Sequence, residues 1–160
     1  MPGLLSIGEM GALALHAMLE TARLAKQSPE KWTSVSDLAD ALLASRHTLH
    51  KVAKRLVMAG FLESSRGPQG GVRLQADPES LSLLSILATV EAGVDEGGCL
   101  FARRVCHADS VCQFCGITMD LERMVHNYFA KTTLADLVRR LATQPPPILL
   151  SQLMDHPPRD

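Results

Sequence analysis

All four cysteines of this chain lie within one stretch of seventeen residues, CLFARRVCHADSVCQFC, which covers positions 99–115. The spacers between them are six, five and two residues long. Four thiolates complete either a two-iron or a four-iron cluster, and they also suit tetrahedral zinc, although zinc ribbons normally carry two C-x-x-C pairs and this stretch has one. A thiol sensor that forms a disulfide on oxidation is a further alternative, whereas the charged neighbours argue against simple apolar packing. The candidate metal ligands are Cys99, Cys106, Cys112 and Cys115.

The composition of the whole chain favours packed helices and argues against a membrane span. Apolar residues make up 46% of the 160 residues but aromatic residues only 4%, so Leu, Ala, Val and Met must fill the core. The chain has no run of eighteen apolar residues, and its N-terminal stretch lacks the positively charged start of a secretory signal. We therefore expect a cytoplasmic protein. In that compartment clustered cysteines are more typical of metal or redox chemistry than of structural disulfides.

Hydrophobic periodicity and capping residues predict a helix-turn-helix followed by a β-hairpin. A first helix is expected over residues 7–26, a second after the N-cap Ser34, and a third between the N-cap Ser45 and Gly60. Two short extended runs then flank the turn residues Gly-Pro-Gln-Gly-Gly, which is typical of a hairpin, and Asp77-Pro78 is expected to open a further helix. The predicted fold class is mainly α with a small β-hairpin: a winged helix-turn-helix with a long C-terminal dimerisation helix.

The C-terminal part of the chain is expected to form a long helix with one apolar face, followed by a short closing helix capped by Thr133. Because this face needs a partner surface and most oligomers are symmetric, the expected partner is a second copy of the chain. The predicted organisation is a winged-helix DNA-binding domain (1–92), a cysteine loop (93–116), the dimerisation and closing helices (117–143) and a proline-broken tail (144–160). The predicted dimerisation residues are Ile117, Leu121, Met124, Val125 and Tyr128.

Basic residues are concentrated in the predicted helix-turn-helix and hairpin. Residues 45–76 contain six basic residues and one acid, a local charge of +5 in a chain whose net charge is −1. The N-terminal end of such a helix can enter the DNA major groove while Lys and Arg hold phosphates, and a hairpin can reach the minor groove or the backbone. The alternative is a solvated charged face, which is common on helices. The candidates on the helix are Ser45, Arg46, His47, Thr48, His50, Lys51, Lys54 and Arg55, and those on the hairpin are Arg66, Gln69 and Arg73.

Three stretches, RGPQGGVRL, DPESLSLLSILATVEAG and TTLADL, together with the spaced cysteines, resemble the bacterial winged-helix regulators typified by IscR, NsrR and RirA. The resemblance covers nearly the whole chain, from about residue 4 to residue 141. It implies a homodimer that crosses through the long C-terminal helix and holds an iron–sulfur cluster near that helix. It also implies that DNA binding changes when the cluster is gained, lost or altered, and it places Cys99, Cys106 and Cys112 on the three cluster cysteines.

The fourth cluster ligand differs among these relatives. The regulators of iron–sulfur biogenesis carry a histidine three residues after the last cysteine, where this chain has Cys115. The nitric-oxide sensors use an aspartate from the first helix of the partner subunit, and the matching position here is Ala12. Glu9, one turn earlier on that helix, and His16, one turn later, are the alternatives to Cys115 as fourth ligand.

These patterns predict a homodimeric transcription regulator that binds a double-stranded DNA operator under the control of an iron–sulfur cluster. The signal would be redox state, nitric oxide, or iron and cluster supply. One alternative is a constitutive repressor with structural zinc or a thiol–disulfide switch. An alternative of another class is an electron-transfer iron–sulfur protein, against which the helix-turn-helix and hairpin argue. The sequence contains no nucleophile motif, phosphate loop or paired acid and base, so we do not expect an enzyme.

Overall fold

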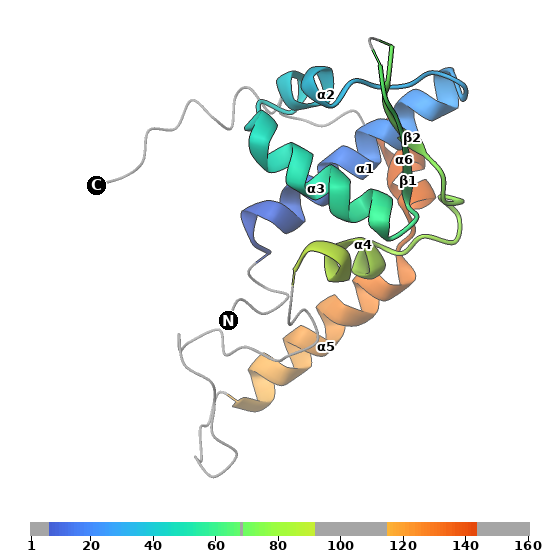
Figure 1. The fold of residues 1–160 in the computed structure, drawn as a ribbon. Helices are drawn as coiled ribbons and strands as arrows, with labels where there is room; N and C mark the ends of the chain where they lie inside the picture. Colours follow the sequence, from blue (N-terminus) through green and yellow to red (C-terminus); the bar gives the residue numbers. More distant parts are fainter. Residues whose placement is uncertain (1–6, 68, 92–114, 144–160) are drawn as a thin grey trace.

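The computed structural model describes residues 7–67, 69–91 and 115–143 (Figure 1). This part of the chain is mainly helical and contains one two-stranded antiparallel hairpin, which confirms the predicted fold class. In chain order the elements are α1 (Glu9–Gln27), α2 (Val35–Ala41), α3 (Arg46–Met58), β1 (Leu62–Ser65), β2 (Gly71–Leu74), α4 (Leu83–Val90), α5 (Cys115–Lys131) and α6 (Leu134–Thr143).

Helices α2 and α3 form the helix-turn-helix, and both begin at the predicted serine caps. The Ser34 hydroxyl accepts hydrogen bonds from two backbone amides in the first turn of α2, the nearer at 3.2 Å. The Ser45 hydroxyl accepts one from the amide of Thr48 at 3.5 Å. Each cap satisfies amides that the first turn of a helix leaves without partners. In the turn between the helices Leu43 adopts a left-handed conformation (φ 51°), which is costly for a residue with a Cβ.

The hairpin is held against the helix-turn-helix by a third extended segment. Strands β1 and β2 pair from Leu62 opposite Leu74 to Ser65 opposite Gly71. Thr33, just before α2, forms a β-bridge with Val72: the two residues exchange backbone hydrogen bonds of 2.9 and 2.8 Å. A Cβ on Gly71 would lie 2.1 Å from the Thr33 carbonyl oxygen, so this close approach requires glycine.

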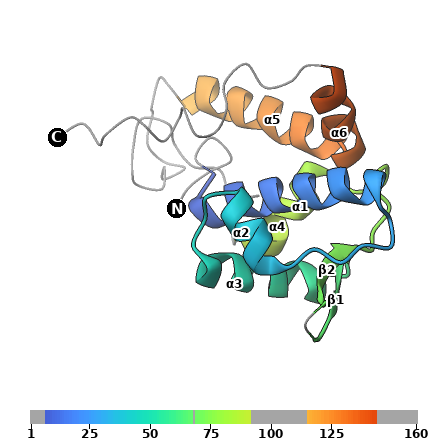
Figure 2. The same cartoon turned by 90° about the horizontal axis from the view of Figure 1, so that it is seen from above.

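The core forms around α1, which lies between α3 on one side and α6 on the other (Figure 2). Aliphatic side chains fill it, as the low aromatic content requires. Leu134 of α6 is fully buried among them, so the closing helix shares one core with the helix-turn-helix. The largest fully buried side chains are Met18, Leu38, Leu49, Leu56, Leu62, Ile86, Leu87 and Leu134.

The helix expected to open at Asp77-Pro78 begins later, at Leu83, with Ser82 as its N-cap. Residues 77–81 instead form a turn in which the Asp77 carboxylate accepts a hydrogen bond from the amide of Glu79. The carbonyls of Pro78 and Leu81 accept hydrogen bonds from the start of α6, at 3.0 and 2.8 Å. Two backbone carbonyls of this segment are therefore hydrogen-bonded to α6 and not within a helix formed by residues 77–81.

The closing helix begins as predicted. The Thr133 hydroxyl accepts from the amide of Asp136, and the Asp136 carboxylate accepts from the amide of Thr133, which is a reciprocal capping box. The predicted cysteine loop and tail lie almost wholly outside the described residues. Within the described ranges, no helix is both long and apolar enough to cross a bilayer.

Candidate nucleic-acid interface

Helix α3 and the hairpin lie on the same side of the molecule, and α5 and α6 lie on the opposite side (Figure 2). The hairpin tip extends past α3, so the two elements bound one surface. A helix flanked by a projecting hairpin is the arrangement with which a winged helix meets duplex DNA.

The side of α3 that faces away from the core carries polar and basic side chains. Leu49, Val52 and Leu56 are fully buried and fix the orientation of the helix. His47, His50, Lys51 and Lys54 are exposed. Within the described part of the chain neither lysine has an acidic partner, so both charges are available to phosphate groups.

A groove of about 570 Å³ separates α3 from the hairpin. Lys54 and His50 line it from the helix, and Arg66 from the hairpin. The remaining polar lining consists of hydroxyl groups that the sequence analysis missed. Hydroxyls and cations together are the side chains that hold a nucleic-acid backbone. These hydroxyl residues are Ser34, Ser36, Ser64 and Ser65.

Two predicted arginine contacts at the helix are already engaged in the protein. Arg46 forms an ion pair of 2.9 Å with Asp40 of α2, and both side chains are more than 60% exposed, so water weakens the pair. Thr48 and Arg55 flank the outer face, and Arg55 points toward α4, where it donates a hydrogen bond of 2.6 Å to the carbonyl of Val90. Arg55 is therefore a link between helices in this structure.

Arg73, the third engaged arginine, is bound at the base of the hairpin. It donates hydrogen bonds to Glu63 and to Glu30, the latter at 3.0 Å, and its guanidinium lies 4.5 Å from the centre of the Trp32 ring. The hydrogen bond to Glu63 is the main reason that its pKa is raised above the usual value. Arg66 and Gln69 lie nearer the hairpin tip, and both are exposed.

The predicted metal ligands are only partly described by the structure. Cys99, Cys106 and Cys112 lie outside the described residues; Cys115 is the first residue of α5, and its side chain is not described. On α1, Glu9 is exposed. His16 donates a 2.7 Å hydrogen bond from Nδ1 to the Ala12 carbonyl, so Nε2 is the ring atom that would bind a metal. Among the described residues no group of three His, Cys, Asp or Glu side chains is placed to hold a metal ion.

Four of the five predicted dimerisation residues form an exposed stripe on α5. Their side chains are 56%, 39%, 68% and 49% exposed for Ile117, Leu121, Met124 and Tyr128. At 100° per residue the four lie within about 60° of one another around the helix. Val125 lies beside them but is turned inward, packed against Leu87 of α4. The stripe defined by the four exposed residues is therefore open, whereas Val125 belongs to the packing within the subunit.

The family model described as "Rrf2: Iron-dependent Transcriptional regulator" matches residues 7–140. The chain belongs to the Rrf2 family. Among relatives, the HTH-type transcriptional regulator IscR of Vibrio campbellii is 29% identical over 129 residues, which cover 81% of this chain and 74% of that protein. The putative HTH-type transcriptional regulator BadM of Rhodopseudomonas palustris is 40% identical over 82 residues, about half of each chain.

Solved structures of Rrf2-type regulators share the fold. CymR (YrzC), described as the global cysteine regulator of B. subtilis, superposes with a TM-score of 0.65 at 25% identity, over 83% of this chain and 95% of that one. IscR of T. potens gives a TM-score of 0.67 at 19% identity, over 91% and 95% of the two chains. Because the family model and the named relatives are transcriptional regulators, the protein is a DNA-binding transcriptional regulator of winged-helix fold rather than an enzyme, as the sequence predicted.

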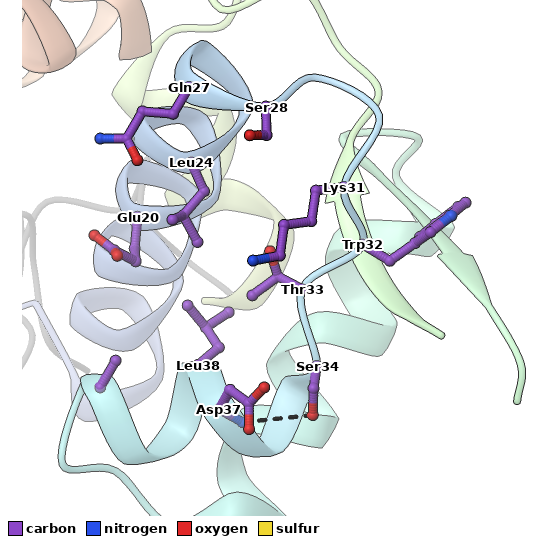
Figure 3. A pocket seen from close by; sticks show the side chains of 11 residues that line it. Glu20, Leu24, Gln27, Ser28, Lys31, Trp32, Thr33, Ser34, Asp37 and Leu38 are labelled. Atoms are coloured by element: carbon purple, nitrogen blue, oxygen red, sulfur yellow. Dashed lines mark hydrogen bonds between the residues drawn. The ribbon is translucent and has the colours of Figure 1, made fainter. Parts of the chain in front are cut away.

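A second hollow of this Rrf2 protein, of about 280 Å³, lies between α1, the 28–34 loop and α2 (Figure 3). Leu24 and Leu38 supply apolar lining, and the Lys31 side chain extends toward the hollow. In the described part of the chain no buried polar side-chain atom lacks a hydrogen-bond partner, here or elsewhere. The candidate interface is therefore the face of α3 and the hairpin, where the exposed cations lie.

Proposed function

We propose that this protein is a homodimeric Rrf2-family regulator whose binding to a DNA operator is switched by an iron–sulfur cluster held by its cysteines. The observation that carries the proposal is the set of four thiols in seventeen residues, placed between the end of α4 and the start of α5. Along the sequence, these thiols lie between the half of the chain that forms the helix-turn-helix and α5, the helix with the exposed apolar stripe.

The DNA-binding part of the proposal rests on the outer face of α3 and on the groove beside it. Ser45 caps the end of α3 that would enter the major groove, where His47 and His50 would meet base edges. Lys51, Lys54 and Arg66 would hold phosphates, with Gln69 at the hairpin tip. Because Arg46 shares its charge with an exposed carboxylate, it can exchange Asp40 for a phosphate at little cost.

The homodimer part rests on the exposed stripe of Ile117, Leu121, Met124 and Tyr128. Contiguous exposed apolar residues on one helix face mark an interaction surface, and a two-fold pairing buries the same stripe on both copies. Sedimentation analysis of Met124→Glu should show a monomer where the wild type sediments as a dimer. Met119→Glu is the matched control, because Met119 is 54% exposed but lies off the stripe. A wild type that sediments as a monomer would refute this part.

The cluster part rests on the chemistry of the donor set. Thiolates are the preferred ligands of iron–sulfur clusters, and Cys99, Cys106, Cys112 and Cys115 supply four. When bound, the cluster would supply a group that oxidants, nitric oxide or iron shortage can alter. His16 remains the alternative to Cys115, because its hydrogen bond to the Ala12 carbonyl uses Nδ1 and not Nε2. Glu9, with a carboxylate in place of an imidazole, is the other candidate on α1.

The alternatives give different metal contents. A repressor with structural zinc would contain zinc without sulfide, and a thiol–disulfide sensor would contain neither. An electron-transfer protein would contain a cluster but show no preference among DNA sequences. Lys51 and Lys54 of α3 are exposed and have no acidic partner among the described residues, which favours the regulator over the carrier.

The deciding experiment is anaerobic purification, followed by counting iron, acid-labile sulfide and zinc per subunit. The proposal expects iron and sulfide, their loss in Cys115→Ala, and no loss in His16→Ala. Operator binding is then measured with cluster-loaded and cluster-free protein, for which the proposal expects different affinities. Zinc alone, no metal in strictly anaerobic protein, or equal operator affinity in the two forms would refute the switch.

A further inference from the structure

Among the residues that the structure describes, Arg55 is the one basic side chain of α3 that donates a hydrogen bond to the backbone of another helix. Its guanidinium donates a hydrogen bond of 2.6 Å to the carbonyl oxygen of Val90, the last residue of α4. A carbonyl in the last turn of a helix has no donor within that helix, and the negative end of the helix dipole favours a cation there. Helices α3 and α4 lie side by side in Figure 1, and this hydrogen bond joins them at the end of α4.

The next residue, Glu91, makes the complementary contact with α1. Its Oε1 atom accepts a hydrogen bond of 3.0 Å from the backbone amide of Gly11, in the first turn of α1. The amides of a first turn lack partners within the helix, and the positive end of the dipole favours a carboxylate. Gly11 leaves room for this contact, because a Cβ there would lie 2.3 Å from Oε1 of Glu91.

We propose that Val90 and Glu91 form a junction that positions α3 for DNA, with Arg55 as a positioning residue rather than a phosphate contact. This deepens the proposed function and rests on it, because it concerns how the DNA-binding helix is held. Two adjacent residues are bound on one side to α3 and on the other to α1, so the orientation of α3 depends on both bonds together. In the sequence, Glu91 precedes the first cysteine, Cys99, by eight positions. Any change that displaces residues 90–91 therefore alters DNA affinity.

Salt dependence separates this role from direct phosphate binding. For the wild type, Arg55→Met, Glu91→Ala, the double variant and the control Lys54→Met, operator affinity is measured over a range of salt concentrations. Lys54→Met should lower the slope of log affinity against log salt by about one per subunit. Arg55→Met should weaken binding about tenfold, the worth of one charge-assisted hydrogen bond, without changing the slope. The double variant should lose no more than Arg55→Met alone, because both substitutions open the same junction.

Amide exchange in the DNA-free protein tests the junction independently of DNA. Arg55→Met should speed exchange of the Gly11 amide, on the far side of the junction, whereas Lys54→Met should not. Gly11→Ala as a single substitution should speed amide exchange in the first turn of α1, because its methyl group would meet the Glu91 carboxylate. In protein that also carries Glu91→Ala this carboxylate is gone, so adding Gly11→Ala should not speed exchange further.

Two results would overturn the proposal. One is a salt slope that falls in Arg55→Met as far as in Lys54→Met, together with a double variant whose loss of operator affinity equals the sum of the losses of Arg55→Met and Glu91→Ala. The other is an exchange rate of Gly11 that Arg55→Met leaves unchanged. A wild type that binds no DNA would instead refute the proposed function, and the exchange experiment would still decide whether the junction exists.

Discussion

Lys51 and Arg73 carry the same charge in the same basic module, yet the structure predicts different effects when each is replaced by Met. Lys51 is exposed on the outer face of α3 and has no acidic partner among the described residues. Arg73 is only 26% exposed and is hydrogen-bonded to Glu63 and Glu30. We expect Lys51→Met to remove a phosphate contact and Arg73→Met to leave the number of phosphate contacts unchanged.

The size of the difference follows from counterion release. Each phosphate contact contributes about 0.9 to the slope of log affinity against log salt for duplex DNA. In a two-fold dimer Lys51→Met removes two contacts, so the slope falls by about 1.8. A doubling of the salt concentration should then weaken the variant about 3.5-fold less than it weakens the wild type.

Fluorescence anisotropy titrations of a labelled operator, at several salt concentrations, measure this slope. Arg73→Met should keep the wild-type slope while shifting the emission of Trp32, the single tryptophan, because the guanidinium no longer stacks on its ring. If Arg73→Met lowers the slope as far as Lys51→Met does, the reasoning that internal ion pairs withdraw a cation from DNA is refuted.

Three further predictions concern stability. At Leu43, whose φ is 51°, Leu43→Gly should be more stable than Leu43→Ala by about 1 kcal/mol in urea denaturation, the reverse of their order in a helix. Leu134→Ala should lower the free energy of unfolding by about 2–5 kcal/mol in the same assay, because the side chain is fully buried; a smaller loss would mean that α6 is not part of the core. Asp136 has its pKa lowered to about 2, chiefly by the hydrogen bond from the Thr133 amide, so its stabilising effect should be complete above pH 4 and fade as the pH falls toward 2. Melting temperatures of wild type and Asp136→Asn should therefore differ at pH 6 and converge near pH 2.

Helices whose first residues follow a capping side chain were predicted correctly from the local sequence. Ser34, Ser45 and Thr133 each precede an apolar helical pattern, and each caps a helix in the structure. The hairpin followed from glycine-rich turn residues between two short extended runs. Asp77-Pro78 carried a similar start signal, but that prediction was wrong because α6, distant in sequence, takes the carbonyls of residues 78 and 81. A local sequence pattern does not show that a helix distant in sequence will bind these carbonyls.

The sequence predicted the position of α5 better than it predicted which of its residues face the rest of the subunit. Val125 fits the apolar pattern of the exposed stripe on α5 as well as its neighbours do, yet it faces Leu87 of α4. Periodicity places a residue within a broad apolar arc, and which edge of that arc contacts α4 depends on how the two helices cross. A wide apolar arc that serves two partners, one within the subunit and one outside it, looks like a single face in the sequence.

A charge count does not show which cations the fold engages in contacts within the protein, and this bears on the candidate interface. The sequence counts six cations in residues 45–76, but three of them are engaged inside the protein: Arg46 with Asp40, Arg55 with Val90 and Arg73 with Glu63 and Glu30. Two of their carboxylate partners, Asp40 and Glu30, lie outside the segment that was counted. The three remaining cations, Lys51, Lys54 and Arg66, lie on the face of α3, in the groove and on the hairpin. Arginine, with a planar fork of donors, suits fixed internal contacts, whereas lysine holds phosphate as a mobile point charge. We therefore expect Arg46, Arg55 and Arg73 to contribute mainly to the geometry of the DNA-binding surface. Lys51, Lys54 and Arg66 are then expected to supply most of its attraction for phosphate.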